Sequence, residues 1–166
     1  ELALFLQNNN SFLKIPYIFT SSEILYPHQR ELIEERFCGK VMSYYGMAER
    51  VAFASECNYG NLHINTDYSY VEILDNTGNP TQDYGFITGT TFHNNIMPLI
   101  RYQLSDITKW KNLECPCKSI EPVIEPIKGK FEDTLYSKNG DPISPSVLTF
   151  AFKSQNNIKK SQVAQT

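Results

Sequence analysis

The first third of the chain alternates between apolar runs and one amphipathic segment. Residues 15–20 form an apolar, β-branched and aromatic run, which predicts a buried strand. Pro27 opens a helical pattern with one apolar face, and we expect this helix to end at Gly39. Residues 41–44 predict the next strand. The order strand, helix, strand predicts an α/β unit, with residues 45–49 just beyond a strand's carboxyl end, where open α/β sheets bind ligands.

From residue 60 the pattern changes to short segments of alternating polarity, at 62–65, 70–74 and 85–90. Residues 75–80 read Asp-Asn-Thr-Gly-Asn-Pro, which is typical of a hairpin turn. This pattern predicts a small antiparallel β subdomain over residues 60–128. Together with the first unit, it places the chain in the α/β (α+β) class.

Composition narrows the classes of protein that fit. Hydrophobic residues make up 41% of the 166 residues, charged residues 20%, and the formal net charge is −3, as in an ordinary soluble globular protein. No apolar run approaches the roughly 20 residues of a membrane helix, so we expect no membrane span. No secretory signal pattern opens the chain, so a cytoplasmic location is the expectation. The acidic balance argues against a nucleic-acid partner.

Three short motifs follow one another along the chain: Tyr-Tyr-Gly-Met-Ala-Glu at 44–49, Arg-Tyr-Gln-Leu-Ser-Asp at 101–106 and Gly-Lys-Phe-Glu-Asp at 129–133. With residues 97–102 (Met-Pro-Leu-Ile-Arg-Tyr), they resemble the YGxTE, YRTGD and GRxDD motifs of the adenylate-forming (AMP-binding) superfamily. The closest likeness is to the phenylacetate-CoA ligase branch, including its capsule-biosynthesis relatives.

The resemblance implies a particular domain organisation. Residues 1–128 would be the end of a large N-terminal AMP-binding domain, and residues 129–166 the hinge and the start of a small C-terminal domain. The chain would then be a fragment of a longer enzyme. The phosphate-binding loop and the catalytic lysine of such an enzyme would lie outside it, and we expect the fragment alone to be inactive.

Three residues carry the implied nucleotide site. The resemblance places Tyr45 against adenine, Glu49 on Mg²⁺ and Asp106 on the ribose hydroxyls of ATP or AMP. Each role suits the side chain, because an aromatic face stacks on a base, a carboxylate is a hard oxygen ligand, and an aspartate accepts hydrogen bonds from two vicinal hydroxyls. Taken singly, Tyr45 could instead be a packing aromatic, Asp106 a turn residue, and Glu49 a solvated surface charge.

The resemblance extends the site to further positions. Ser22 and Glu23 match the loop that lies along the adenosine, while Gly46 and Ala48 belong to the first nucleotide motif. Lys130 belongs to the third motif and is, with Glu49, a catalytic candidate.

Some positions depart from the family's pattern. Ala48 stands where Thr or Ser is usual, Leu104-Ser105 replaces Thr-Gly, and Lys130 replaces an arginine, which keeps the charge but loses the bidentate fork. Glu132 falls at the pivot between the two catalytic conformations, where backbone freedom matters more than the side chain.

Three of the four cysteines and one histidine form a second candidate site. Cys57 and His63 lie at one end of the predicted β subdomain and Cys115-Pro116-Cys117 lies at the other, so one Zn²⁺ could join the two ends. Three thiolates and one imidazole make a closed, structural site. Similar Cys, His and CxC residues occur in members of the phenylacetate-CoA ligase branch. Disulfides are not expected in a cytoplasmic chain. Cys38 is expected to be a buried apolar residue.

These observations predict a fragment of an ATP-dependent carboxylate-activating ligase, which forms an acyl-adenylate and passes the acyl group to a thiol, with CoA as the expected acceptor. One alternative is transfer to an amine or a sugar in polysaccharide biosynthesis. Another is a zinc-stapled interaction module without catalysis. The partners would be a small carboxylate, the nucleotide and the acyl acceptor; the sequence leaves the identity of the carboxylate and the oligomeric state open.

Overall fold

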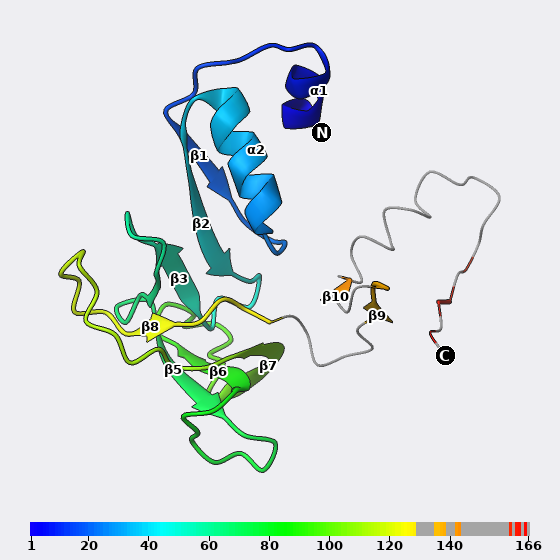
Figure 1. Cartoon of the computed structure of the whole chain (residues 1–166). Coiled ribbons are helices and arrows are strands. Elements are labelled where there is room, and N and C mark those ends of the chain that lie inside the picture. The colour runs from blue at the N-terminus through cyan, green and yellow to red at the C-terminus, as the bar shows by residue number, and fades with distance from the viewer. Residues whose placement is uncertain (129–134, 139–141, 144–159, 161, 164, 166) are drawn as a thin grey trace.

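The computed structural model describes residues 1–128, 135–138, 142–143, 160, 162–163 and 165 (Figure 1). The elements run in the order α1 (Leu2–Asn8), β1 (Tyr17–Thr20), α2 (Pro27–Phe37), β2 (Lys40–Gly46), β3 (Phe53–Glu56), β4 (Leu62–Ile64), β5 (Ser69–Leu74), β6 (Gly85–Thr91), β7 (Tyr102–Thr108), β8 (Val123–Ile124), β9 (Leu135–Tyr136) and β10 (Pro142–Ile143). Within the described residues, the strands form sheets of order β1-β2-β3-β4-β8, β5-β6-β7 and β10-β9. This arrangement confirms the predicted α/β (α+β) class.

Strand β2 joins the two kinds of pairing in the larger sheet. Its first half pairs in parallel with β1, from Lys40 to Ser43, and its second half pairs antiparallel with β3, from Tyr44 to Gly46. The predicted strand, helix, strand unit is therefore confirmed, but the prediction that its first strand is buried was wrong, because Tyr17 and Phe19 on β1 are 63% and 70% exposed. The predicted position of the first motif was wrong in part, because β2 continues through Gly46 and Tyr45 lies on the strand, held there by its pairing with Ala54.

Helix α2 begins as the sequence predicts and ends at Phe37, two residues before the predicted end at Gly39. Pro27 occupies the first turn, and the Gln29 side chain accepts a hydrogen bond from the Tyr26 N–H (3.1 Å). At the other end it is Cys38, with φ 48°, that adopts the left-handed conformation usually found for glycine. Cys38 is exposed there, so the prediction that it is buried was wrong. Gly39 is needed for space, since a Cβ there would lie 1.8 Å from the Ile15 carbonyl oxygen.

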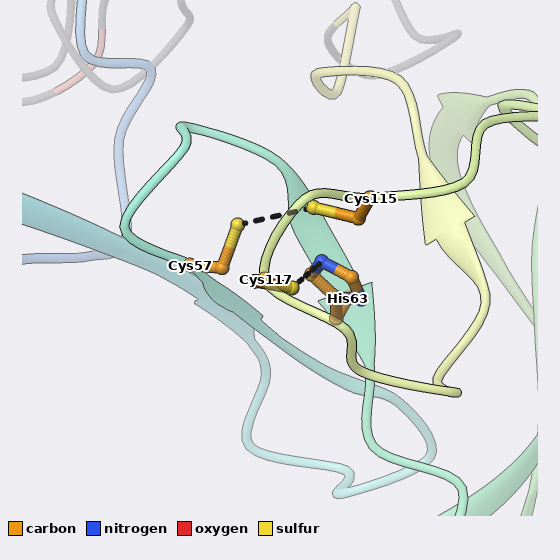
Figure 2. Close-up of side chains that lie close together, drawn as sticks. All are labelled: Cys57, His63, Cys115 and Cys117. Carbon is orange, nitrogen blue, oxygen red and sulfur yellow. Dashed lines mark hydrogen bonds between the residues drawn. The ribbon is translucent and has the colours of Figure 1, made fainter.

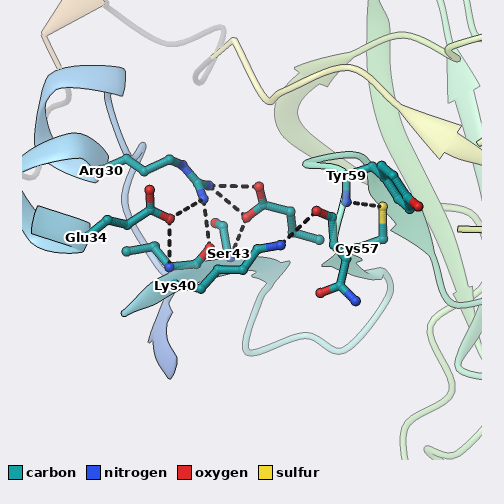
Figure 3. Close-up of polar contacts among 9 residues, drawn as sticks. Arg30, Glu34, Lys40, Ser43, Cys57 and Tyr59 are labelled. Atoms are coloured by element: carbon teal, nitrogen blue, oxygen red, sulfur yellow. Dashed lines mark hydrogen bonds and ion pairs between the residues drawn. The ribbon is translucent and has the colours of Figure 1, made fainter. Parts of the chain in front are cut away.

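A buried carboxylate fixes α2 and β3 to β2 (Figure 3). The Glu56 side chain, 8% exposed, accepts hydrogen bonds from Arg30 Nη2 at 2.8 and 2.9 Å and from the Ser43 N–H at 2.7 Å. Arg30 Nη1 also donates to the Val41 carbonyl (2.8 Å), and Glu34 accepts from the Val41 N–H (2.9 Å). The network lies where β2 changes partner, so it replaces backbone pairing with charged side-chain contacts at that point.

The predicted hairpin is confirmed between β5 and β6. The Asp75 carboxylate accepts hydrogen bonds from the N–H groups of Thr77 and Asn79 (both 2.9 Å), and Gly78 has φ 84°. Strands β5, β6 and β7 pair antiparallel, as expected for the β subdomain. Strands β4 and β8, however, belong to the larger sheet, so the boundary predicted near residue 60 does not separate one sheet from the other.

Two apolar clusters share the space between the sheets, as Figure 1 suggests from the neighbouring positions of β3, β8 and β5–β7. One is built on Val51 and Ile87 and the other on Ile64 and Ile124, and the partly buried Tyr45, Val71 and Ile127 pack against both. A third cluster lies under α1 and α2. In the described part of the chain, no helix has the length and hydrophobicity required to cross a bilayer.

Candidate nucleotide site and metal centre

The structure brings two predicted nucleotide-site residues into direct contact. Tyr45 on β2 and Asp106 on β7 are 61 positions apart in sequence, and the Tyr45 hydroxyl donates a hydrogen bond of 2.8 Å to Asp106 Oδ2. Both side chains are half-buried. The first two motifs therefore meet at one place, although they belong to different sheets.

The electrostatics of this pair fix which group holds the proton. Burial, then the charge of Asp106, the hydrogen bond to it and the charge of Glu49 all raise the pKa of Tyr45 well above its ordinary value. The phenol therefore stays protonated and acts as the donor. Glu49 itself is exposed, in the turn that directly follows β2 and therefore comes four residues after Tyr45.

The other predicted nucleotide residues take more exposed positions. Ser22, with φ 75°, and Glu23 lie exposed in the loop after β1. Since β1 and β2 are parallel, this loop leaves the sheet at the same edge as the end of β2. Gly46 pairs with Phe53, and Ala48 is exposed in the turn.

The third motif cannot be placed in this way. Lys130 and the pivot candidate Glu132 lie outside the described residues, and their roles stay predictions.

Arg101, at the start of the second motif, has a partner that the sequence did not predict. Its guanidinium donates to Glu72 on β5, with Nε 3.0 Å and Nη2 3.3 Å from the carboxylate oxygens. Arg101 also has φ 48°, and its N–H donates to the Thr90 hydroxyl (2.9 Å). The contact holds the entry of β7 against β5 and β6, which positions Asp106 further along the strand.

The four predicted metal ligands converge (Figure 2). One ligand atom from each of Cys57, His63, Cys115 and Cys117 lies within 4.8 Å of all the others. Cys57 Sγ is 3.6 Å from Cys115 Sγ, and Cys117 Sγ is 3.4 Å from His63 Nε2. A tetrahedral zinc ion with Zn–S bonds of about 2.3 Å requires sulfur atoms roughly 3.7 Å apart. The spacing in this cluster therefore suits such an ion.

The surroundings of His63 fix the tautomer that a metal ligand needs. His63, 6% exposed on β4, has Nδ1 3.0 Å from the backbone oxygen of Glu121. A carbonyl can only accept, so Nδ1 must carry the proton, which leaves the Nε2 lone pair directed at Cys117. This arrangement, in which a backbone carbonyl sets the tautomer, is typical of histidine ligands.

Donors also surround the sulfur atoms. The Tyr59 N–H and the Asn61 amide lie 3.4 Å from the sulfurs of Cys57 and Cys115, respectively, and Lys111 donates to the other end of that amide (3.1 Å). Burial alone would raise the pKa of Cys115, but hydrogen bonds from the Cys117 N–H, the two neighbouring thiols and Asn61 outweigh it and lower that pKa.

The pKa of Cys117 moves the other way. The hydrogen bond from the Ser119 N–H lowers it, but the neighbouring thiols of Cys115 and Cys57, together with burial, outweigh that effect, so the pKa of Cys117 is raised above its ordinary value. Within the cluster, Cys115 is therefore more readily converted to the thiolate that binds metal than Cys117.

Comparison with known proteins supports the resemblance to CoA ligases that the three sequence motifs indicate. No family model matches the chain. The phenylacetate-coenzyme A ligase of Thermus thermophilus is 28% identical over 130 residues, which cover 74% of this chain and 29% of that protein. The solved structure of 2-hydroxyisobutyryl-CoA ligase in the postadenylation state, in complex with R3-HIB-AMP, is 25% identical, with a TM-score of 0.69 over 91% of this chain and 34% of that one. In sequence and in fold, the chain is therefore similar to CoA ligases of the adenylate-forming superfamily.

A second structure of 2-hydroxyisobutyryl-CoA ligase extends the likeness to another catalytic state. In complex with 2-HIB-AMP and CoA, in the thioesterification state, it matches with a TM-score of 0.67 and 25% identity over 93% of this chain and 35% of that one. The present chain thus spans about a third of the length of the ligases that it matches, and what the whole protein does is a matter for proposal.

Proposed function

We propose that this chain is part of an ATP-dependent acid–CoA ligase. The enzyme would join a carboxylate to the α-phosphate of ATP, release pyrophosphate, and pass the acyl group from the adenylate to the thiol of CoA. The observation that carries the proposal is the hydrogen bond between Tyr45 and Asp106, with Glu49 in the turn that follows Tyr45's strand. Superfamily relatives bound to acyl-AMP and CoA support it.

Each site residue has a distinct role in this proposal. Asp106 keeps its second oxygen, Oδ1, without a hydrogen-bond partner among the described residues, so it can accept from the ribose hydroxyls. The exposed carboxylate of Glu49 offers a hard oxygen ligand that would hold Mg²⁺, and the metal would neutralise charge on the phosphates. The Tyr45 ring would lie against adenine, with Ser22, Glu23, Gly46 and Ala48 lining the adenosine.

The domain division after residue 128 remains part of the proposal. Ile127 packs against both apolar clusters, and the Lys128 N–H donates to the Ile107 carbonyl (2.9 Å), so the chain is held to β7 up to this point. A hinge at Glu132 would then allow Lys130 to enter and leave the site between the two half-reactions.

Pyrophosphate exchange tests the proposal in the protein that carries this sequence. Labelled pyrophosphate should enter ATP only when a carboxylate is present, tested with a panel that includes phenylacetate and 2-hydroxyisobutyrate. Asp106→Ala and Glu49→Gln should each lower exchange by roughly tens- to hundreds-fold, the cost of losing a charge-assisted contact. The surface changes Asp83→Asn and Glu31→Gln are the controls. Wild-type exchange in both site variants would refute the assignment.

The acyl acceptor is tested separately on the same protein. Mass spectrometry after addition of CoA should show a thioester. A product formed with an added amine or amino sugar, and none with CoA, would favour the alternative acceptor.

We further propose that Cys57, His63, Cys115 and Cys117 bind one structural Zn²⁺. The support is the convergence of four ligand atoms, the tautomer that Glu121 imposes on His63, and the donors around the sulfurs. The ion would tie the β3–β4 hairpin to the segment before β8.

Elemental analysis should give one zinc per chain. Cys115→Ser should lose the metal and lower the melting temperature, because a structural zinc contributes directly to folding. Cys38→Ser, at the exposed end of α2, should keep both the metal and the stability. A metal-free wild-type protein with full stability would contradict the proposal.

A further inference from the structure

We propose that Tyr45 is a positioning residue for Asp106: its hydroxyl holds one carboxylate oxygen so that the other meets the ribose diol, which makes Tyr45 a determinant of selectivity for ribose over 2′-deoxyribose. The inference rests on the proposed function, because it takes Asp106 as the ribose contact. It goes beyond that function in giving the Tyr45 hydroxyl a role separate from that of its ring.

The hydroxyl comes from a rigid part of the fold. Tyr45 pairs with Ala54 across the β2–β3 ladder, and its ring packs against both apolar clusters between the sheets. A ring held on the strand and against two clusters cannot swing away without opening the core. The phenol oxygen is therefore a fixed point from which Asp106 is held.

Asp106 is held less firmly by its own strand. It lies on β7 between the buried Leu104 and Thr108, where the pairing of β7 with β6 shifts register between Phe86 and Thr88. The χ2 torsion of an aspartate has a broad distribution of angles, so the backbone alone does not fix the orientation of the carboxylate plane. The 2.8 Å hydrogen bond to Oδ2 removes that freedom and leaves Oδ1 as the acceptor for a ligand.

The charge state supports the same division of roles. Burial and the neighbouring carboxylates keep the Tyr45 phenol protonated, so it remains a donor throughout the pH range in which an enzyme would work. A phenylalanine would keep the ring and its packing and would lose only this donor. The two roles of Tyr45 can therefore be separated by one oxygen atom.

The test is titration calorimetry with ATP and with 2′-deoxy-ATP on the protein that carries this sequence. Wild type should bind ATP about tenfold or more tightly than 2′-deoxy-ATP, as expected for a hydrogen bond to a charged group. Tyr45→Phe should reduce this ratio to about threefold or less, and should add nothing further in an Asp106→Asn background. Tyr44→Phe, which removes the hydroxyl of the neighbouring exposed tyrosine, should leave the ratio unchanged.

The outcomes separate this inference from the proposed function. A Tyr45→Phe protein that keeps the wild-type ratio would show that Tyr45 acts through its ring alone, and a wild type that does not discriminate would remove the ribose role of Asp106; either result overturns the inference. Pyrophosphate exchange on the same proteins tests the chemistry independently. If the wild type exchanges no pyrophosphate but Tyr45→Phe still loses the discrimination, the positioning role would be supported and the ligase activity refuted.

Discussion

Replacing Glu56 by alanine should destabilise the protein by about 2–4 kcal/mol. Removing one member of a buried ion pair costs about 3–5 kcal/mol when both partners are enclosed. The Glu56 side chain is 8% exposed but that of Arg30 is 29% exposed, so solvent partly stabilises the arginine left behind and the cost is reduced. The change also leaves the Ser43 N–H without its acceptor, at the point where β2 exchanges one partner strand for another.

Urea unfolding of the protein that carries this sequence measures this cost. Glu56→Gln keeps an acceptor for the Ser43 N–H and should lose about half as much, while Arg30→Met combined with Glu56→Gln should lose less than the sum of the two single changes. The control is Glu31→Gln at an exposed position of α2, which should cost at most about 0.5 kcal/mol. A Glu56→Ala cost near that of the control, or strict additivity with Arg30→Met, would refute the reasoning.

Two further predictions concern a glycine and a turn. Gly39→Ala should cost about 1–3 kcal/mol in urea unfolding, because its Cβ would lie 1.8 Å from the Ile15 carbonyl oxygen. At Gly46, where the nearest atom would be 3.5 Å from the added Cβ, alanine should be tolerated; equal losses at the two positions would contradict this reasoning. Hydrogen bonds from Asn79 and Thr77 lower the pKa of Asp75 below its ordinary value of 3.8, so its contribution to stability is present above about pH 4 and is lost as the pH falls through the folded-state pKa. Stability measured between pH 2 and 6 should fall more in wild type than in Asp75→Asn.

Part of the fold follows from local patterns in the sequence. The strand, helix and strand between residues 15 and 46 could be predicted because apolar, β-branched and aromatic residues dominate both strands and the helix between them is amphipathic; Asp75 with its turn residues predicts the β5–β6 hairpin. Strands β3 and β7 were not predicted. Strand β3 reads Phe-Ala-Ser-Glu, too short to show a period, and β7 alternates weakly because Ser105 and Asp106 interrupt its apolar positions. These two strands are stabilised by tertiary pairing rather than by local preference.

The candidate sites show the same limit. The chemistry of a cysteine, a histidine or an aspartate can be read from residue type and order, and the structure brings the four predicted metal ligands together. The residues around them could not be predicted. Glu121 acts on His63 through its backbone carbonyl, which any residue would supply, and Glu56 is one of many acidic residues until the fold places Arg30 beside it. The error at Cys38 has a similar origin, because only the geometry of the helix end shows that Cys38, and not Gly39, takes the left-handed turn.

The two candidate sites are linked by one strand. Strand β3 pairs at one end with Tyr45 and Gly46, and its other end runs through Glu56 directly into Cys57. Strand β4 pairs with β3 and carries His63, opposite Ser55. Metal bound at Cys57 and His63 would therefore hold β3 and β4, and β3 is the strand with which Tyr45 pairs. The proposed zinc would in this way stabilise the register of β3 against β2, the strand from which the Tyr45 hydroxyl reaches Asp106.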